Sequence, residues 1–156
     1  MDALRRVLLR STGGGAALAA ALAAGLLKPQ QVLAAGWNKD AFGAKTPADA
    51  LKGIGAANAA ESKDVLIEAP QIAENGGVVP IEITSNVPGT RSISVLIEKN
   101  PFPLAGHFEF REGAVPFVKV NVKIGESSNV RVVAEAGGKF YVATKEIKVT
   151  IGGCGG

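Results

Sequence analysis

Cysteine and histidine are almost absent from this sequence of 156 residues, which contains one of each, Cys154 and His107. A single cysteine cannot form a disulfide within the chain, and metal sites built from these residue types need several ligands at regular spacing. The histidine also lies far along the sequence from any serine in a glycine-flanked elbow, so no hydrolase triad is predicted. We therefore expect His107 to be a structural or surface residue, and we predict no catalytic residue, no metal site and no cofactor.

An excess of positive charge is missing from most of the chain. The formal net charge is +3, but residues 1–35 carry four of the 17 basic residues and one of the 14 acidic residues. The rest of the chain therefore has 13 residues of each sign and no basic patch that would predict nucleic-acid binding. Hydrophobic residues make up 47% of the sequence, which is enough for a packed core.

Residues 1–35 resemble a signal peptide. Arg5 and Arg6 precede a short apolar stretch, and residues 13–27 form a run of alanine, glycine and leucine. The arginine pair resembles the twin-arginine export signal, and the run is less apolar than a membrane-spanning helix usually is. We predict cleavage after Ala34 or Ala35 and a periplasmic protein with no membrane attachment afterwards. An ordinary secretory signal and an N-terminal membrane anchor are the alternatives.

Residues 36–64 are predicted to form an N-terminal helical segment. Thr46 is a favourable N-cap, Pro47 suits the first helical turn, and Asp49 places an acidic group at the third helical position. Gly53 should end this helix. We expect its apolar residues to cover an edge or an end of the following domain; they are Phe42, Leu51 and Ile54.

Residues 65–151 change to a period of two, with apolar residues at alternate positions in segments 65–67, 79–83, 93–97, 117–124, 130–134, 140–142 and 147–151. Gly137 and Gly138 indicate a hairpin between two of these segments. Short strands with frequent turns predict an all-β fold, an immunoglobulin-like antiparallel β-sandwich. Residues 99–104 contain two prolines and form either a partner interface or a crossover between the two sheets.

The sequence ends in four glycines around the single cysteine, Gly152, Gly153, Cys154, Gly155 and Gly156. Glycine has no side chain to cover a thiol and loses much conformational entropy on ordering, so residues 152–156 are predicted to be a flexible arm with an exposed thiol. The arm carries no cation that would stabilise a thiolate, so we expect a partner's pocket to activate it. The thiol could carry a substrate, form an intermolecular disulfide in a structural periplasmic protein, or deliver copper, although no methionine, histidine or second cysteine assists the last role.

The terminal Gly-Gly-Cys-Gly-Gly, residues 69–80 (APQIAENGGVVP) and residues 98–104 (EKNPFPL) resemble the SoxY family, the sulfur-carrier subunits of bacterial thiosulfate oxidation. Phe102 departs from the small polar residue expected at its position. The resemblance implies that thiosulfate is attached oxidatively to Cys154 and that separate enzymes process it. It also implies a heterodimer with SoxZ and three processing partners: a c-type cytochrome that loads thiosulfate, a hydrolase that releases sulfate, and in many organisms a sulfane dehydrogenase. The chain itself would be a carrier and not an enzyme.

Overall fold

The structure is a computed structural model that describes residues 38–150. Arg5, Arg6 and the predicted arm, residues 152–156, lie outside these residues, so the signal peptide and the exposed thiol of Cys154 remain predictions. Two short helices, α3 (Lys39–Gly43) and α4 (Pro47–Gly53), lie in the segment that was predicted to be helical. Within residues 38–150, neither helix is long and apolar enough to span a bilayer.

Side chains at the helix starts explain where both helices begin. Asn38 accepts a hydrogen bond from the backbone N–H of Ala41 at 3.0 Å, and Thr46 Oγ1 accepts one from that of Asp49 at 3.1 Å. Each bond satisfies an N–H group that has no partner within its own helix. The predicted cap at Thr46, with Pro47 as the first helical residue, is therefore confirmed.

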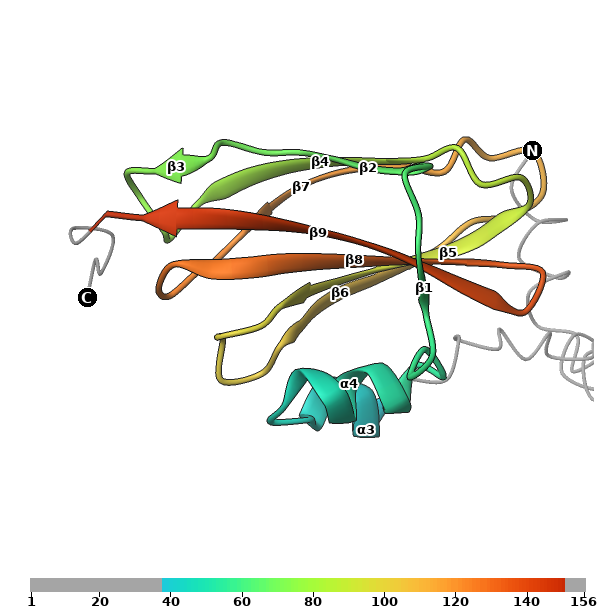
Figure 1. Ribbon diagram of the computed structural model, residues 1–156, viewed down its shortest axis with the longest axis horizontal. Helices are drawn as coiled ribbons and strands as arrows, with labels where there is room; N and C mark the ends of the chain where they lie inside the picture. Colours follow the sequence, from blue (N-terminus) through green and yellow to red (C-terminus); the bar gives the residue numbers. More distant parts are fainter. Residues whose placement is uncertain (1–37, 151–156) are drawn as a thin grey trace, which may run out of the picture. The chain divides into compact units, whose positions relative to one another are not determined.

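The strands among residues 38–150 form two sheets (Figure 1). The larger sheet has the order β1-β9-β8-β5-β6, with β3 also paired to β9, and the smaller sheet has the order β2-β4-β7. The strands are β1 (Ala60–Glu61), β2 (Val65–Glu68), β3 (Ile72–Ala73), β4 (Val79–Ser85), β5 (Thr90–Ile97), β6 (Leu104–Glu109), β7 (Phe117–Val122), β8 (Ser128–Ala136) and β9 (Lys139–Val149).

This arrangement confirms the predicted β-sandwich. The long strands pair in antiparallel fashion, and Gly137 and Gly138, both with positive φ, form the expected hairpin between β8 and β9. The two-residue strands β1 and β3 instead pair with β9 in parallel. Segment 36–64 is therefore not wholly helical, because its Ala60 and Glu61 extend the larger sheet.

The main core lies between the facing sides of the two sheets, where alternate strand residues are almost completely buried. The largest of these side chains are Ile81, Ile83, Ile93, Ile97, Ile124 and Ile147. On the solvent side of the smaller sheet, Glu82 and Lys119 lie opposite each other and form an ion pair. The hydrogen bond from Lys119 and the negative charge of Glu82 together raise the pKa of Lys119.

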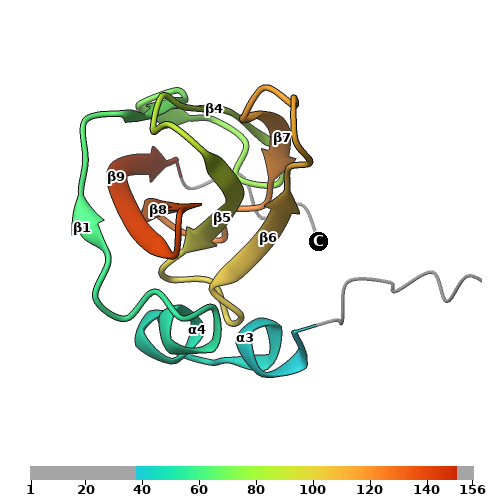
Figure 2. The same ribbon diagram turned by 90° about the vertical axis from the view of Figure 1, so that its right-hand side faces the viewer.

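The helices cover the outer face of the larger sheet, which corrects the expectation that they would cover an edge or an end (Figure 2). Buried Ala41 and Ala50 pack in one cluster with Leu96, Leu104 and Val133, apolar residues whose side chains would otherwise face water. The predicted contact residues do pack against this second cluster; they are Phe42, Leu51 and Ile54.

Strand β6 was not predicted from the sequence, and it changes the interpretation of residues 99–104. These residues join β5 to β6, which are neighbours in one sheet. The predicted alternative of a crossover between the two sheets is therefore wrong. The loop contacts the helical segment through Lys45, whose Nζ lies 3.5 Å from the centre of the Phe102 ring. Phe102, the departure from the family pattern, is thus held against a cation.

Candidate functional site

The predicted site residue, Cys154, lies four residues beyond Thr150, the last residue that the structure describes. The end of β9 therefore fixes the point from which the predicted arm leaves the sandwich. Figure 1 shows β3, the start of β4 and the end of β9 together at this end of the fold, which we call the arm end. Its hydrogen bonds determine how firmly the arm is anchored.

One side of the strand end is held by β3 and by the residues directly before and after it. The Lys148 N–H donates to the Gln71 carbonyl at 2.9 Å, and the Thr150 N–H donates to the Ala73 carbonyl at 3.1 Å. The Thr150 hydroxyl donates to the Glu74 carbonyl at 3.3 Å. Terminal strands often fray, but Thr150 is bonded here through both its backbone and its side chain.

Ser127, in the loop between β7 and β8, holds Val149 at the same end of the strand. Its hydroxyl oxygen accepts a hydrogen bond from the Val149 N–H at 2.9 Å and donates one to the Val149 carbonyl at 3.4 Å. Both backbone polar groups of Val149 are thus bonded to one side chain. This is unusual support for the last residue of a strand, and it depends on a single hydroxyl.

Gly76 brings two loops together over Val149. Its carbonyl accepts a hydrogen bond from the Ile124 N–H at 2.7 Å. A Cβ atom added at Gly76 would lie 2.8 Å from Val149 Cγ1 and closer still to the Ile124 carbonyl oxygen, so only glycine fits without displacement. We call the groups around the strand end the arm-base clamp; they belong to Ala73, Glu74, Gly76, Ile124 and Ser127.

Asn100 links a third loop to the clamp. Its side-chain amide donates to the Lys123 carbonyl at 2.8 Å, and its carbonyl oxygen accepts from the Gly125 N–H at 3.2 Å. The β5–β6 loop thereby braces the loop that carries Ser127. The predicted arm thus starts from a platform in which three loops are tied to one another by specific bonds.

We expect Gly76→Ala to lower the free energy of unfolding by about 1–3 kcal/mol, because the added methyl group overpacks the clamp. Denaturant unfolding of the purified chain measures this difference. Gly43→Ala is the matched control, since a Cβ there meets no atom within 4 Å, and its stability should be unchanged or slightly higher. Equal stabilities for the two variants would contradict the close packing at Gly76.

The structure brings together a serine, a histidine and a glutamate that the sequence does not place side by side. Ser94 Oγ lies 2.8 Å from His107 Nδ1, and His107 Nε2 lies 3.8 Å from a Glu109 carboxylate oxygen. Ser94 is only 2% exposed, so no substrate reaches its hydroxyl. The group joins β5 to β6 and supports the structural role predicted for His107.

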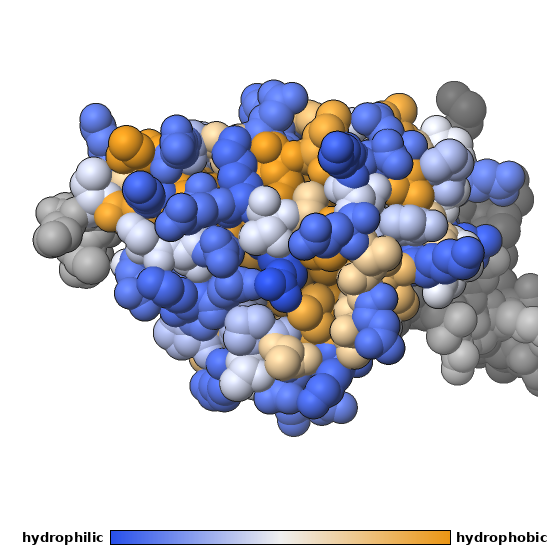
Figure 3. Space-filling model, viewed as in Figure 1, coloured by the Kyte–Doolittle hydropathy of each residue, from blue (hydrophilic) through white to orange (hydrophobic). Residues whose placement is uncertain are grey.

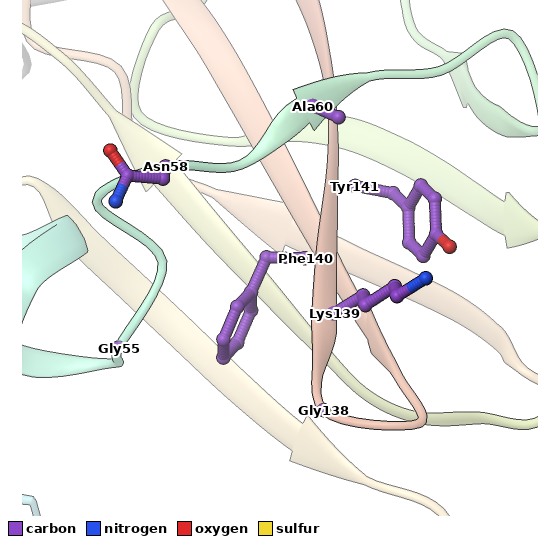
Figure 4. Close-up of a pocket in the computed structure, with 7 residues that line it drawn as sticks. All are labelled: Gly55, Asn58, Ala60, Gly138, Lys139, Phe140 and Tyr141. Atoms are coloured by element: carbon purple, nitrogen blue, oxygen red, sulfur yellow. The ribbon is translucent and has the colours of Figure 1, made fainter.

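The described residues contain a pocket of about 380 Å³ beside the β8–β9 hairpin. Figure 4 shows Phe140 pointing toward Gly55, while Lys139 and Tyr141 project to the other side of the strand. Strand β9 has 11 residues, so about 33 Å separates this pocket from the arm end. Four extended residues after Thr150 reach only about 14 Å, so Cys154 of the same chain cannot occupy it.

Metal ligands do not gather in the described part of the chain. Among residues 38–150, no group of three or more histidine, cysteine, aspartate or glutamate residues could hold a metal ion. Two further pockets share Arg91 as a lining residue and lie at the end of β5 remote from the arm end.

A family model described as sulfur oxidation protein SoxY matches residues 51–154, which is more than half of the chain. Among solved structures, the sulfur carrier protein SoxY from Chlorobium limicola f thiosulfatophilum is 34% identical with a TM-score of 0.63, and the match covers 72% of this chain and 99% of that one. A superoxide reductase (neelaredoxin) from Ignicoccus hospitalis is 23% identical with a TM-score of 0.50, over 55% of this chain and 80% of that one. This second likeness concerns the fold alone. A search of curated proteins finds no match.

Proposed function

Because the chain belongs to the SoxY family of sulfur oxidation proteins, we propose that it carries sulfur intermediates covalently on the sulfur atom of Cys154. The observation that carries this proposal is the extent of the family match, which runs through the β-sandwich and ends at Cys154 itself. As a sulfur carrier, the chain binds and presents the intermediate and is not itself the catalyst. Its own contribution is to position one thiol.

Loading joins the Cys154 thiolate to thiosulfate through a new sulfur–sulfur bond. The product is R–S–S–SO₃⁻, where R–S is the cysteine, and its formation from R–S⁻ and S₂O₃²⁻ releases two electrons. Those electrons need an acceptor, which is the role of a c-type cytochrome partner. The thiolate is the reactive form of cysteine, and no cation lies in the arm, so the partner's pocket supplies the activation.

Release of sulfate then uses water and no further oxidant. R–S–S–SO₃⁻ and H₂O give R–S–SH, SO₄²⁻ and one proton, which leaves a persulfide on Cys154. A hydrolase partner performs this step, and a sulfane dehydrogenase, where present, oxidises the remaining sulfur. Covalent attachment keeps each intermediate at a high local concentration while it passes between enzymes.

The clamp and the glycines have complementary roles in this proposal. The arm-base clamp fixes Thr150, whereas Gly152, Gly153, Gly155 and Gly156 add no side chains that would obstruct a narrow channel. Each docking orders the glycines at a cost in conformational entropy, which keeps the visits brief. The carrier works in the periplasm as a heterodimer with SoxZ, after twin-arginine export directed by Arg5 and Arg6.

Intact-mass measurement of the protein purified from its natural host, without reductant, tests the proposal. We expect thiosulfate-derived adducts on the peptide that contains Cys154, and we expect a thiol reductant to remove them. A disulfide-linked dimer as the sole modified form would support the structural alternative instead. A copper-bound form without sulfur adducts would indicate metal delivery.

A further inference from the structure

We propose that Ile72 and Val78 form an apolar docking rim for the enzymes that process Cys154, and that each enzyme covers this rim with the apolar entrance of its active-site channel. The inference rests on the proposed function and adds a contact surface on the body of the carrier.

The clamp limits how far Cys154 can travel from the sandwich. Thr150 is bonded to Ala73 and Glu74, so the reach of Cys154 is measured from Thr150. Four extended residues span about 14 Å at 3.3–3.6 Å per residue. An enzyme that encloses the thiol in a channel must therefore bring the mouth of that channel against the arm end.

Ile72 lies directly beside the anchored strand end. It is paired with Lys148 in the β3–β9 ladder, and the next residue, Ala73, accepts the Thr150 hydrogen bond. The side chain of Ile72 is 59% exposed, whereas that of the next residue, Ala73, is buried. An exposed isoleucine in a two-residue strand contributes little to the core, so its burial by a partner would be favourable.

Val78 lies on the other side of the turn that closes over Val149. It follows Gly76 by two residues, and Gly76 is the residue whose added Cβ would contact Val149. The turn is fixed because Asn75 accepts a hydrogen bond from the Gly77 N–H at 2.8 Å. Val78 is 58% exposed and precedes the buried Val79 of β4.

Phe102, in the β5–β6 loop, is also exposed, but its ring is in contact with Lys45. Position distinguishes Ile72 and Val78 from Val115. Val115 is 75% exposed but lies in the β6–β7 loop, at the end of the sandwich remote from Thr150. Figure 3 shows hydrophobic side chains at the left of the view, where β3 lies in Figure 1, among polar neighbours. An apolar contact ringed by polar groups has the general anatomy of a protein–protein interface.

The test uses the mature chain in complex with SoxZ and the sulfate-releasing hydrolase of the same organism. Tetrathionate loads the carrier, because its exchange with the Cys154 thiolate leaves R–S–S–SO₃⁻ and releases thiosulfate. The variant Ile72→Thr with Val78→Thr keeps a branched β-carbon at both sites. The matched control is Val115→Thr, which makes the same chemical change at the remote end.

We expect the double variant to raise the KM of the hydrolase for the loaded carrier about tenfold, the size of effect that about 1.4 kcal/mol of lost contact produces. The kcat and the rate at which iodoacetamide alkylates Cys154 should not change, and Val115→Thr should behave as the unmodified chain does. An unchanged KM in the double variant would overturn the proposal. If the double variant does not fold, Val78→Thr alone, which lies outside the strands, repeats the measurement.

Two further measurements distinguish enzyme docking at this surface from a role in assembly and from failure of the proposed function. Loss of the SoxZ complex, or loss of self-association, measured by sedimentation of the double variant, would show that the rim serves assembly and would overturn enzyme docking. Cys154→Ser tests the proposed function independently, since it must abolish sulfate release whatever the rim does. If Cys154→Ser abolishes sulfate release while the rim variant keeps an unchanged KM, the docking proposal is refuted and the proposed carrier function stands.

Discussion

Cys154→Ser should abolish thiosulfate-dependent sulfate release in a reconstituted system while changing the free energy of unfolding by less than about 1 kcal/mol. Serine has nearly the same shape but forms no sulfur–sulfur bond, so no intermediate can be attached. The position follows the last described strand, and a side chain flanked by glycines is not expected to take part in the packed core. Turnover assays and denaturant unfolding of the same preparation measure the two effects.

A relocated thiol provides the control for this variant. Val115→Cys in the Cys154→Ser background places one exposed cysteine at the opposite end of the sandwich. It should react with a small alkylating reagent but should not restore sulfate release, because it lacks the glycine arm. Restored turnover would mean that any exposed thiol suffices and that the position of Cys154 is unimportant.

Gly153→Val with Gly155→Val should reduce turnover by the partner enzymes at least as severely as the rim substitutions, although the thiol is still present. Valine adds a branched side chain on each side of Cys154 and restricts the backbone, so the arm should no longer fit a narrow channel. A small reagent approaches from water and should alkylate Cys154 at a rate close to that of the unmodified chain. Parallel alkylation and turnover assays separate access by reagents from access by enzymes.

Gly43→Val is the control for adding valine at an exposed glycine, since no atom lies within 4 Å of a Cβ at that position. It should leave turnover unchanged. Normal turnover in the arm variant would contradict the proposed channel fit, and the glycines would then need another explanation. Slow alkylation in the arm variant would point to a change in the thiol itself rather than in enzyme access.

The sandwich and the helix cap at Thr46 could be predicted because each depends on local sequence patterns. Alternation in β5 correctly placed Ile93, Val95 and Ile97 in the main core and Leu96 on the opposite face. That the helices would cover Leu96 was not predictable, because their own sequence does not indicate which surface they contact. Strand β6 was missed because Gly106 supplies no apolar side chain to an alternation that is already short.

The arm-base clamp left little signal in the sequence. Two of its five bonds join backbone groups alone, and nearly any residue type supplies those. Its two informative side chains, Ser127 and Thr150, are separated by more than 20 residues, and serine in a loop usually predicts only a turn. A glycine pair such as 76–77 is typical of a turn, but the need for glycine at position 76 arises from Ile124 and Val149, which only the folded chain brings near.

The pairing of β9 also determines how the sandwich would resist a pull on the arm, such as a proposed partner enzyme would exert on leaving. A pull on Thr150 acts along β9, whereas the hydrogen bonds of an antiparallel ladder run across the strand direction. β8 pairs with β9 from Lys139 to Ile147, and β1 and β3 bond its other edge at the two ends. The force is therefore a shear force shared by many bonds, which do not open one by one. A repeated pull on the arm should accordingly leave β9 paired within the sandwich.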